Sequence, residues 1–527
     1  MRRTVLQAVL RTIVVLLAMV GGRAAAAERP NVVLFLVDDL GWADVSPNNP
    51  DTFYETPNVQ RLADEGANFT NGYAANPVCS PTRYSVMTGR YPSRADLTNW
   101  LWGKRKVRFR GAEMIGRLPA GDRTVAEFLR DAGYRTAFLG KWHLGEDEAA
   151  WPEHNGFDVN RGGHSKGHPP SYFSPYRNPR LSDGPEGEYL TDRLAEEAAR
   201  LVDEYAVAGK ADGQSFFLDL SFYSVHTPLQ APQPLVQKYR QKAERLGLDP
   251  AGTFATEEQV YDPAKYGKRR VRTVQSHPTY AAMVESMDAA VGRVLEALDR
   301  NGVAGETLVI FTSDNGGLST SEGSPTSNLP LRGGKGWMYE GGIREPFLIR
   351  WPGVAEAGAT IETPVMTTDI LPTVCEAAGV SMTGAAADGA AADGAEADDD
   401  QANGAAVIDG LSLRPLLQGE GLPERDLFWH YPHYGNQGGF PAAAVRRGDL
   451  KLIERLEDGR THLYDLAADA GERADLSEQR PREAAELREV LHQWYADVDA
   501  NLLRPMPDGP PAWRPKGYHG GTLSAAK

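Results

Sequence analysis

Cysteine is scarce in this sequence: only Cys79 and Cys375 occur among its 527 residues. So few cysteines exclude a fold held together by disulfides. Cys79 lies in a polar turn, whereas Cys375 lies in the apolar stretch 370–378, which is typical of a buried helix. We therefore expect no disulfide between them and interpret Cys375 as a small core residue.

The sequence also lacks an excess of positive charge. Its 71 Asp and Glu outnumber its 56 Lys and Arg, which gives a formal net charge of −15. This balance argues against nucleic acid or an anionic lipid surface as the main partner. An anionic substrate would be repelled by the whole molecule, so its site must concentrate positive charge locally. We therefore expect a basic pocket on an acidic protein.

The apolar run near the N-terminus, Ile13–Val20, is too short for a membrane-spanning helix, which needs about 20 apolar residues. Arg2 and Arg3 precede it and the small residues 24–27 follow it, a pattern typical of a secretory signal peptide. We predict a cleaved signal over residues 1–27, export to the periplasm or medium, and no stable membrane anchor. The paired arginines leave general secretion and twin-arginine export open.

Short runs rich in Val, Ile, Leu and Phe alternate with helical segments along most of the chain. The runs are typical of buried parallel strands and span 32–37, 136–139, 216–220 and 308–311. The helical segments span 58–65, 124–132, 192–205 and 280–301. This alternation predicts an α/β fold, with a mostly parallel sheet covered by helices on both faces.

The length of the chain favours two or more domains. Residues 384–407 are almost entirely Ala, Gly and Asp, which predicts a disordered surface insertion. Beyond it, strand-like stretches precede an amphipathic helix at 482–498, which predicts a smaller C-terminal α+β domain with an antiparallel sheet. We therefore divide the mature chain into a main domain, 28–383, and a C-terminal domain, 408–527.

Polar side chains follow the apolar runs at four places. They are Asp38 with Asp39, Lys141 with His143, His226, and Asp314 with Asn315. Ligands in open α/β sheets bind beyond the carboxyl ends of the strands, where parallel strands bring such groups together. We therefore expect these residues to form one site.

The aspartates and Asn315 offer only hard oxygen ligands, which suit calcium, with magnesium as the alternative. Taken alone, Asp314-Asn315-Gly316 is also typical of a turn, and Asp38-Asp39 of a helix cap. Two such clusters at strand ends favour a cation site.

Cys79 and Arg83 stand at the start of a predicted helix, with Pro81 in its first turn. A helix start can bind an anion, and residues four apart share a helix face, so a nucleophile and a cation would lie side by side. Taken alone, the same residues are equally typical of an ordinary helix start in which the cysteine has no functional role.

Cys79, Pro81 and Arg83, followed by Thr88-Gly89-Arg90, resemble the Cys-x-Pro-x-Arg signature of the type I, formylglycine-dependent sulfatases, an arylsulfatase-like family of the alkaline phosphatase superfamily. The resemblance extends to 30–41, 140–145, 226–228, 313–316 and 332–346. It implies an alkaline phosphatase-like fold and hydrolysis of sulfate esters.

The resemblance also implies that a formylglycine-generating enzyme oxidises Cys79, and that the hydrated aldehyde attacks sulfur. A metal site is implied at Asp38, Asp39, Cys79, Asp314 and Asn315. Catalytic roles are implied for Cys79, Arg83, Lys141, His143, His226, Asp314 and Lys335. Among these, His143 is the base for sulfate release, Asp314 helps to activate the nucleophile, and His226 and Lys335 serve the leaving group.

The leaving group is read by loops that differ between family members. Aromatic and imidazole side chains suit stacking and hydrogen bonding to a sugar, although such clusters also pack domain interfaces. We select Trp100, Lys104, His164, His430 and His433 as substrate-binding residues, with His168 as further lining. A sulfated carbohydrate is the preferred substrate and an aryl sulfate the surrogate.

Two other functions fit parts of the pattern. A phosphodiesterase or phosphonate monoester hydrolase could share the fold, but two-zinc relatives need several histidine ligands where this chain has carboxylates and an amide. A noncatalytic carbohydrate-binding homologue could retain the fold, but it would have no need of the intact set of catalytic residues.

Overall fold

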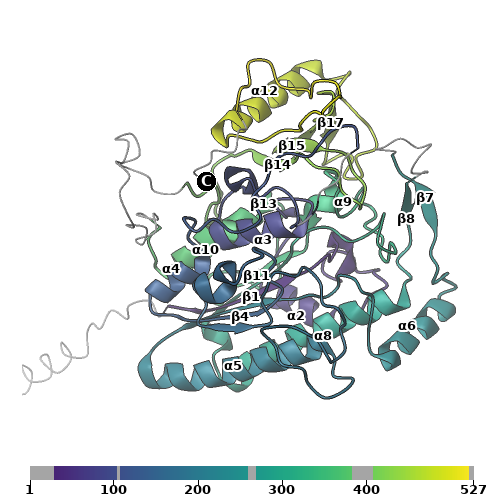
Figure 1. Cartoon of the computed structure of the whole chain (residues 1–527). Coiled ribbons are helices and arrows are strands. Elements are labelled where there is room, and N and C mark those ends of the chain that lie inside the picture. The colour runs from purple at the N-terminus through teal and green to yellow at the C-terminus, as the bar shows by residue number, and fades with distance from the viewer. Residues whose placement is uncertain (1–28, 102, 104–106, 259–268, 383–406, 521–527) are drawn as a thin grey trace, which may run out of the picture.

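The computed structural model describes residues 29–101, 103, 107–258, 269–382 and 407–520 (Figure 1). The predicted signal peptide, residues 384–406 of the predicted insertion, and Lys104 lie outside the described residues. Within the described part of the chain, no helix is long and apolar enough to cross a membrane.

The largest sheet within the described residues has eight strands: β12 (Ala359–Ile361), β2 (Ala67–Phe69), β11 (Phe347–Arg350), β9 (Thr307–Ser313), β1 (Asn31–Val37), β6 (Phe216–Ser221), β4 (Arg135–Gly140) and β5 (Val159–Arg161), in that order across the sheet. The strands from β9 to β5 all pair in parallel. β11 pairs antiparallel with β9 and with β2. The sheet is therefore mostly parallel, and β1 lies near its middle.

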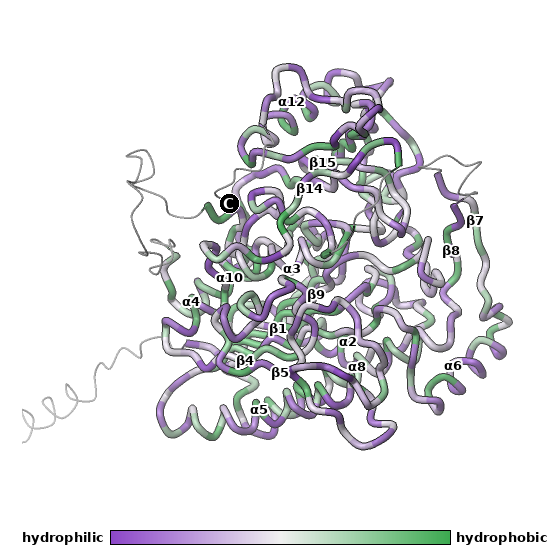
Figure 2. The backbone as a smooth tube through the Cα atoms, in the orientation of Figure 1, coloured by the Kyte–Doolittle hydropathy of each residue, from purple (hydrophilic) through white to green (hydrophobic). Residues whose placement is uncertain are grey.

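Helices cover both faces of this sheet. One face packs against α2 (Pro57–Glu65), α5 (Leu190–Asp212) and α8 (Pro278–Arg300), and the other against α3 (Cys79–Thr88), α4 (Val125–Asp131) and α10 (Ile370–Ala377). Val33 and Phe35 of β1 belong to the first core, and Val32 and Leu34 to the second. Alternate residues of a strand point to opposite faces, so one strand serves both cores. The central strands are correspondingly mostly hydrophobic (Figure 2).

The C-terminal region forms a second, antiparallel sheet of β14 (Leu427–Tyr431), β15 (Ala442–Arg447), β16 (Leu450–Arg455) and β17 (Thr461–Asp465), packed against α12 (Pro481–Asp497). Its core also includes Tyr73 and Trp337 from the main part of the chain, so the two regions share an apolar interface. The predicted fold class, a mostly parallel α/β sheet plus a smaller antiparallel α+β region, is confirmed.

Smaller elements connect these layers. They are β3 (Gly72–Tyr73), β10 (Arg344–Glu345), β13 (Val365–Met366), β7 (Phe254–Thr256), β8 (Arg270–Arg272), α6 (Gln233–Arg245), α9 (Glu340–Ile343) and α11 (Arg414–Leu417). Cys375 is fully buried in α10, and both cysteines are free. The interpretation of Cys375 as a core residue is therefore confirmed.

Candidate active site

The carboxyl ends of four parallel strands meet at one edge of the large sheet. β1 and β9 end at the Val37–Ser313 pair, so Asp38 and Asp314 leave the sheet side by side. β4 and β6 end level with one another, and Lys141 follows β4 directly. The structure thus brings together the polar residues that follow these strands.

The backbone at this edge has unusual conformations. Gly140 has a φ of 99°, and a Cβ atom there would lie 1.9 Å from the carbonyl oxygen of Ser221, so no larger residue fits without moving the strands. Asp39 and His143 have φ values of 63° and 59°, in the left-handed region that non-glycine residues rarely adopt. Such conformations cost free energy and cluster at functional sites, where they aim side chains.

Three carboxylates at this edge are completely buried, and each is paired with one cation. The distances are 2.6 Å from Lys141 Nζ to Asp38 Oδ2, 2.6 Å from Lys335 Nζ to Asp39 Oδ1, and 2.8 Å from Arg83 Nε to Asp314 Oδ2. Arg83 also donates from Nη1 to the carbonyl oxygen of Lys141, at 2.6 Å. Removing one member of such a buried pair leaves an uncompensated charge, so the six side chains hold one another in place.

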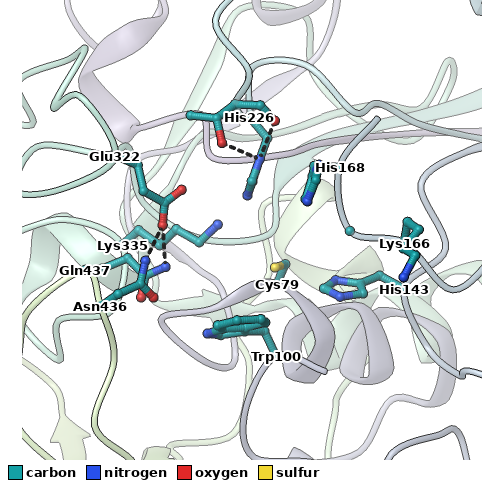
Figure 3. A pocket seen from close by; sticks show the side chains of 12 residues that line it. Cys79, Trp100, His143, Lys166, His168, His226, Glu322, Lys335, Asn436 and Gln437 are labelled. Carbon is teal, nitrogen blue, oxygen red and sulfur yellow. Dashed lines mark hydrogen bonds between the residues drawn. The ribbon is translucent and has the colours of Figure 1, made fainter. Parts of the chain in front are cut away.

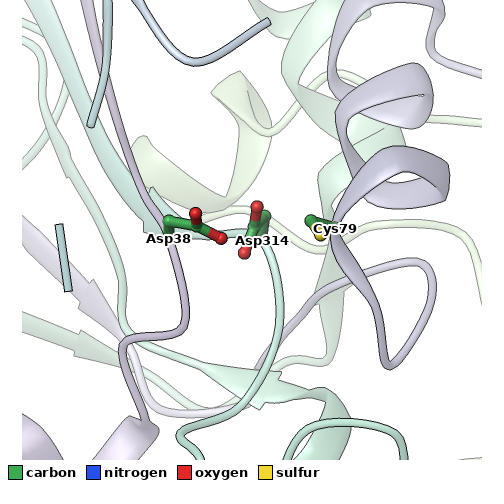
Figure 4. Close-up of side chains that lie close together, drawn as sticks. All are labelled: Asp38, Cys79 and Asp314. Carbon is green, nitrogen blue, oxygen red and sulfur yellow. The ribbon is translucent and has the colours of Figure 1, made fainter. Parts of the chain in front are cut away.

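Cys79 is the first residue of α3 and faces this cluster (Figure 4). Its Sγ lies within 4.8 Å of carboxylate oxygens of Asp38 and Asp314. Burial raises the pKa of the Cys79 thiol, although Lys141 and Lys335 act against this. An unmodified Cys79 would therefore be a protonated, weak nucleophile.

The residues present fit a divalent cation. Asp38 Oδ1, Asp39 Oδ2 and Asn315 Oδ1 are buried and accept no hydrogen bond from any described residue. Buried polar atoms are normally satisfied, so three unsatisfied oxygens in one cluster point to a missing ligand. Carboxylate and amide oxygens are the ligands that calcium and magnesium prefer.

The pKa values of the two adjacent aspartates move in opposite directions. Burial and the Asp314 carboxylate raise the pKa of Asp38 well above its usual range, against the pull of Lys141. Burial also acts to raise the pKa of Asp39, but Lys335, His226 and Lys141 together outweigh it and lower this pKa to about 2. A cation beside Asp38 would remove the repulsion that favours its protonation.

The two predicted catalytic histidines are both held in the neutral form. Burial, with Lys141 and Arg83, lowers the pKa of His143 well below its usual range. Burial, with Lys335, lowers the pKa of His226 to about 4. His226 Nδ1 lies 2.9 Å from the carbonyl oxygen of Thr227, so Nδ1 carries the proton and Nε2 faces Asp39 Oδ2 at 3.7 Å.

A cavity of about 320 Å³ opens above Cys79 (Figure 3). Its described lining consists of Cys79, Trp100, His143, Lys166, Gly167, His168, His226, Thr227, Glu322, Lys335, Asn436 and Gln437. Segments from several strand ends and from the C-terminal region therefore enclose a single pocket over the cysteine and its ion-paired cluster.

A family model described as Sulfatase matches residues 30–380. The chain belongs to the sulfatase family. It is therefore an enzyme that hydrolyses sulfate esters, and the resemblance identified around Cys79 is confirmed.

Relatives match this sulfatase over most of its length. A sulfatase of Formosa agariphila is 29% identical over 92% of this chain and 92% of its own length. Human N-acetylgalactosamine-6-sulfatase is 31% identical and covers 84% of this chain and 73% of its own length. The solved structure of Ps i-CgsB in complex with k-i-k-neocarrahexaose has a TM-score of 0.68 at 26% identity, covering 89% of this chain and 93% of that chain.

The residues predicted to bind substrate in this sulfatase fall into two groups. Trp100 and His168 line the cavity, and the imidazole of His168 stacks on that of His226, with 6.0 Å between ring centroids. His164, His430 and His433 are not among the lining residues of the described cavity. These three histidines lie outside this cavity, and their part in substrate binding stays a prediction.

Each of the three histidines outside the cavity packs against other residues inside the protein. The ring of His164 lies edge-on to Trp151, although its carbonyl oxygen accepts from the backbone N–H of His143 at 3.2 Å. His430 lies on β14 under α12, so its ring packs against aromatic side chains of that helix. His433 Nε2 lies 2.8 Å from Thr98 Oγ1. Of the three, His164 thus contacts the backbone of a cavity residue.

Sequence reasoning missed several residues of the sulfatase cavity. Lys166 lies in the loop between His164 and His168, which were both predicted to line the site. The loop was therefore identified, but the sequence did not show that the side chain of Lys166 faces the cavity. Three other lining residues do not follow a predicted strand: Glu322, Asn436 and Gln437. They meet only because the C-terminal region folds against the loop after β9. No local pattern in the sequence could have found this contact.

Proposed function

We propose that this sulfatase removes sulfate from a sulfated saccharide, using a formylglycine made from Cys79 and a bound divalent cation, with calcium preferred to magnesium. The observation that carries this proposal is the position of Cys79, at a helix start between a carboxylate cluster and the cavity. The enzyme would be exported, and it would depend on a formylglycine-generating enzyme for maturation.

The cation would be held by Asp38, Asp39, Asp314 and Asn315, together with a hydroxyl group of modified Cys79. It would supply Lewis acidity toward a sulfate oxygen, and the hydrated formylglycine would supply the nucleophilic hydroxyl. Three carboxylates face three side-chain cations here, so a divalent cation would also create the local positive surplus that an anionic substrate requires.

Arg83 and Lys141 act as positioning groups on the nucleophile side. Arg83 fixes Asp314 and ties it to the backbone at Lys141, while the ammonium group of Lys141 fixes Asp38. Asp314 is thereby aimed to accept a proton from the attacking hydroxyl. His143 lines the same cavity and its neutral imidazole is suited to act as the base for sulfate release.

His226 and Lys335 face the leaving-group side of the cavity. Because Nδ1 of His226 already donates to the carbonyl oxygen of Thr227, His226 must bind a second proton on Nε2 before it can protonate the departing oxygen. The negative charge of a bound sulfate ester favours that second proton. Lys335 would stabilise the charge that develops on the sulfate oxygens.

The walls of the cavity suit a sugar better than a large apolar alcohol. Trp100 offers an aromatic face, and Lys166 and His168 offer hydrogen-bond donors. The name of the human N-acetylgalactosamine-6-sulfatase and the saccharide in the Ps i-CgsB complex support a carbohydrate substrate. Small aryl sulfates should serve as surrogate substrates.

The reaction class is tested by comparing 4-nitrophenyl sulfate with 4-nitrophenyl phosphate. We expect the higher kcat/KM with the sulfate, because the metal cluster contains carboxylates and an amide rather than the histidines of two-zinc phosphoesterases. The two esters share a leaving group, so their ratio isolates the transferred group. A dominant phosphatase activity would contradict the proposal.

Calcium should stabilise the fold as well as support activity. After treatment with a chelator, calcium at 100 times its Kd should raise the free energy of unfolding by about 2.7 kcal/mol, because it binds the folded cluster and not the unfolded chain. Thermal unfolding with and without calcium measures this directly. The gain should shrink in Asp38→Asn, and equal stability of wild type with and without divalent cations would refute the cation site.

A further inference from the structure

Glu322 places a carboxylate in the wall of a pocket that binds an anion. It lies in the loop after β9, with a φ of 53°, and lines the cavity together with His226 and Lys335 (Figure 3). A carboxylate here repels a sulfate ester. Its charge favours the cationic forms of His226 and Lys335, but that effect does not require the carboxylate to be held in one orientation. Its orientation therefore needs a separate explanation.

The C-terminal region holds this carboxylate in one orientation. Asn436 Nδ2 and Gln437 Nε2 donate to the same oxygen, Oε1 of Glu322, at 2.7 and 2.8 Å. Gln437 is almost completely buried, and its backbone carbonyl oxygen accepts from Thr320 Oγ1 at 2.5 Å, which ties it to the loop that carries Glu322. Among the described residues, none donates to the other oxygen of Glu322, Oε2, which points away from the two amides (Figure 3).

The remaining walls differ in character from this one. Lys166 and His168 offer positive or hydrogen-bond-donating groups, and Trp100 offers an aromatic face. Glu322 therefore makes one wall of the pocket acidic, whereas the wall formed by Lys166 and His168 attracts anions. The volume of about 320 Å³ is at the lower end of the range for ligand pockets, which favours a single sugar ring over a longer stretch of chain.

We propose that Glu322 determines substrate specificity, by accepting a hydrogen bond from a hydroxyl group of the sugar ring that carries the scissile sulfate. The same carboxylate rejects a sugar that presents a second sulfate or a carboxylate at that position, because two like charges close together in the pocket repel. The preferred substrate is thus a sugar ring with one anionic group, the sulfate that is removed. This inference rests on the proposed saccharide sulfatase function.

The test compares kcat/KM for monosulfated monosaccharides with kcat/KM for disulfated forms of the same sugars. For each sugar that the wild-type enzyme hydrolyses, kcat/KM should be about tenfold or more higher for the monosulfated form than for the disulfated form. Glu322→Gln keeps an acceptor for the two amides but removes the charge, and should lower this ratio about tenfold, mainly through faster turnover of the disulfated sugar. Glu322→Ala should shift the ratio in the same direction.

The matched control is Glu296→Gln, which removes the same charge from an exposed position on α8 and should leave the ratio at the wild-type value. Circular dichroism and thermal unfolding establish that each variant is folded. An unchanged ratio in folded Glu322→Gln, or a wild-type preference for disulfated sugars, would overturn the role of Glu322. Turnover of aryl sulfate without turnover of any sulfated sugar would instead overturn the proposed substrate class, and with it this inference.

Discussion

Replacing Cys79 with alanine is expected to abolish sulfatase activity, with a fall in kcat/KM of about 10⁴-fold or more. Alanine cannot be oxidised to an aldehyde, so the site would lose its nucleophile while the surrounding ion pairs remain intact. Turnover of 4-nitrophenyl sulfate by purified Cys79→Ala protein measures this effect. Protein from a host that lacks other sulfatases keeps the background low enough to detect it.

The matched control for this variant is Cys375→Ala. Cys375 is the other cysteine of the chain and is buried in α10, so its replacement should cost some stability but little activity. A Cys79→Ala enzyme that kept near wild-type kcat/KM would show that the nucleophile lies elsewhere. Equal loss of activity in both variants would point to general damage to the fold.

The second large effect is expected for Lys335→Met, which should lower kcat/KM about 10²- to 10³-fold. Lys335 is buried and faces both the cavity and Asp39. Burial alone would lower its pKa, but Asp39 and the other acidic groups around it together outweigh burial and hold the pKa well above its usual range. The charge is therefore fixed where sulfate is to bind. Methionine matches the lysine side chain out to Cε, with sulfur in place of Cδ, and lacks the ammonium group.

Lys166→Met provides the comparison, because Lys166 lines the same cavity but is exposed to solvent. Charges exposed to water contribute less, so this variant should lose much less activity than Lys335→Met. Thermal unfolding of both proteins separates a loss of stability from a loss of catalysis. If the two variants lost activity equally, the special role given to Lys335 would be wrong.

The sequence predicted the parallel core and the strand ends well, for a physical reason. Strands buried on both faces are mostly hydrophobic, so β1 and β9 were visible as apolar runs. Asp38 follows β1 directly, and Asp314 follows β9 directly. The helix that carries Cys79 was equally visible, because Pro81 marks its first turn.

The remaining features depend on contacts between distant segments. β11 is only four residues long and pairs antiparallel with β9, which its short apolar run did not reveal. His430 looked like a binding residue because it is polar and lies among aromatics, but α12 covers it. Glu322 was not singled out because its partners, Asn436 and Gln437, are more than 100 residues away in the chain.

The central claim concerns the chemical state of Cys79 and is tested most directly by peptide mass spectrometry. The protein should be produced together with a formylglycine-generating enzyme, and the peptide that contains Cys79 should be about 18 Da lighter than its cysteine form. Partial conversion should scale with specific activity across preparations. Fully active enzyme in which Cys79 retains an unmodified thiol would contradict the account.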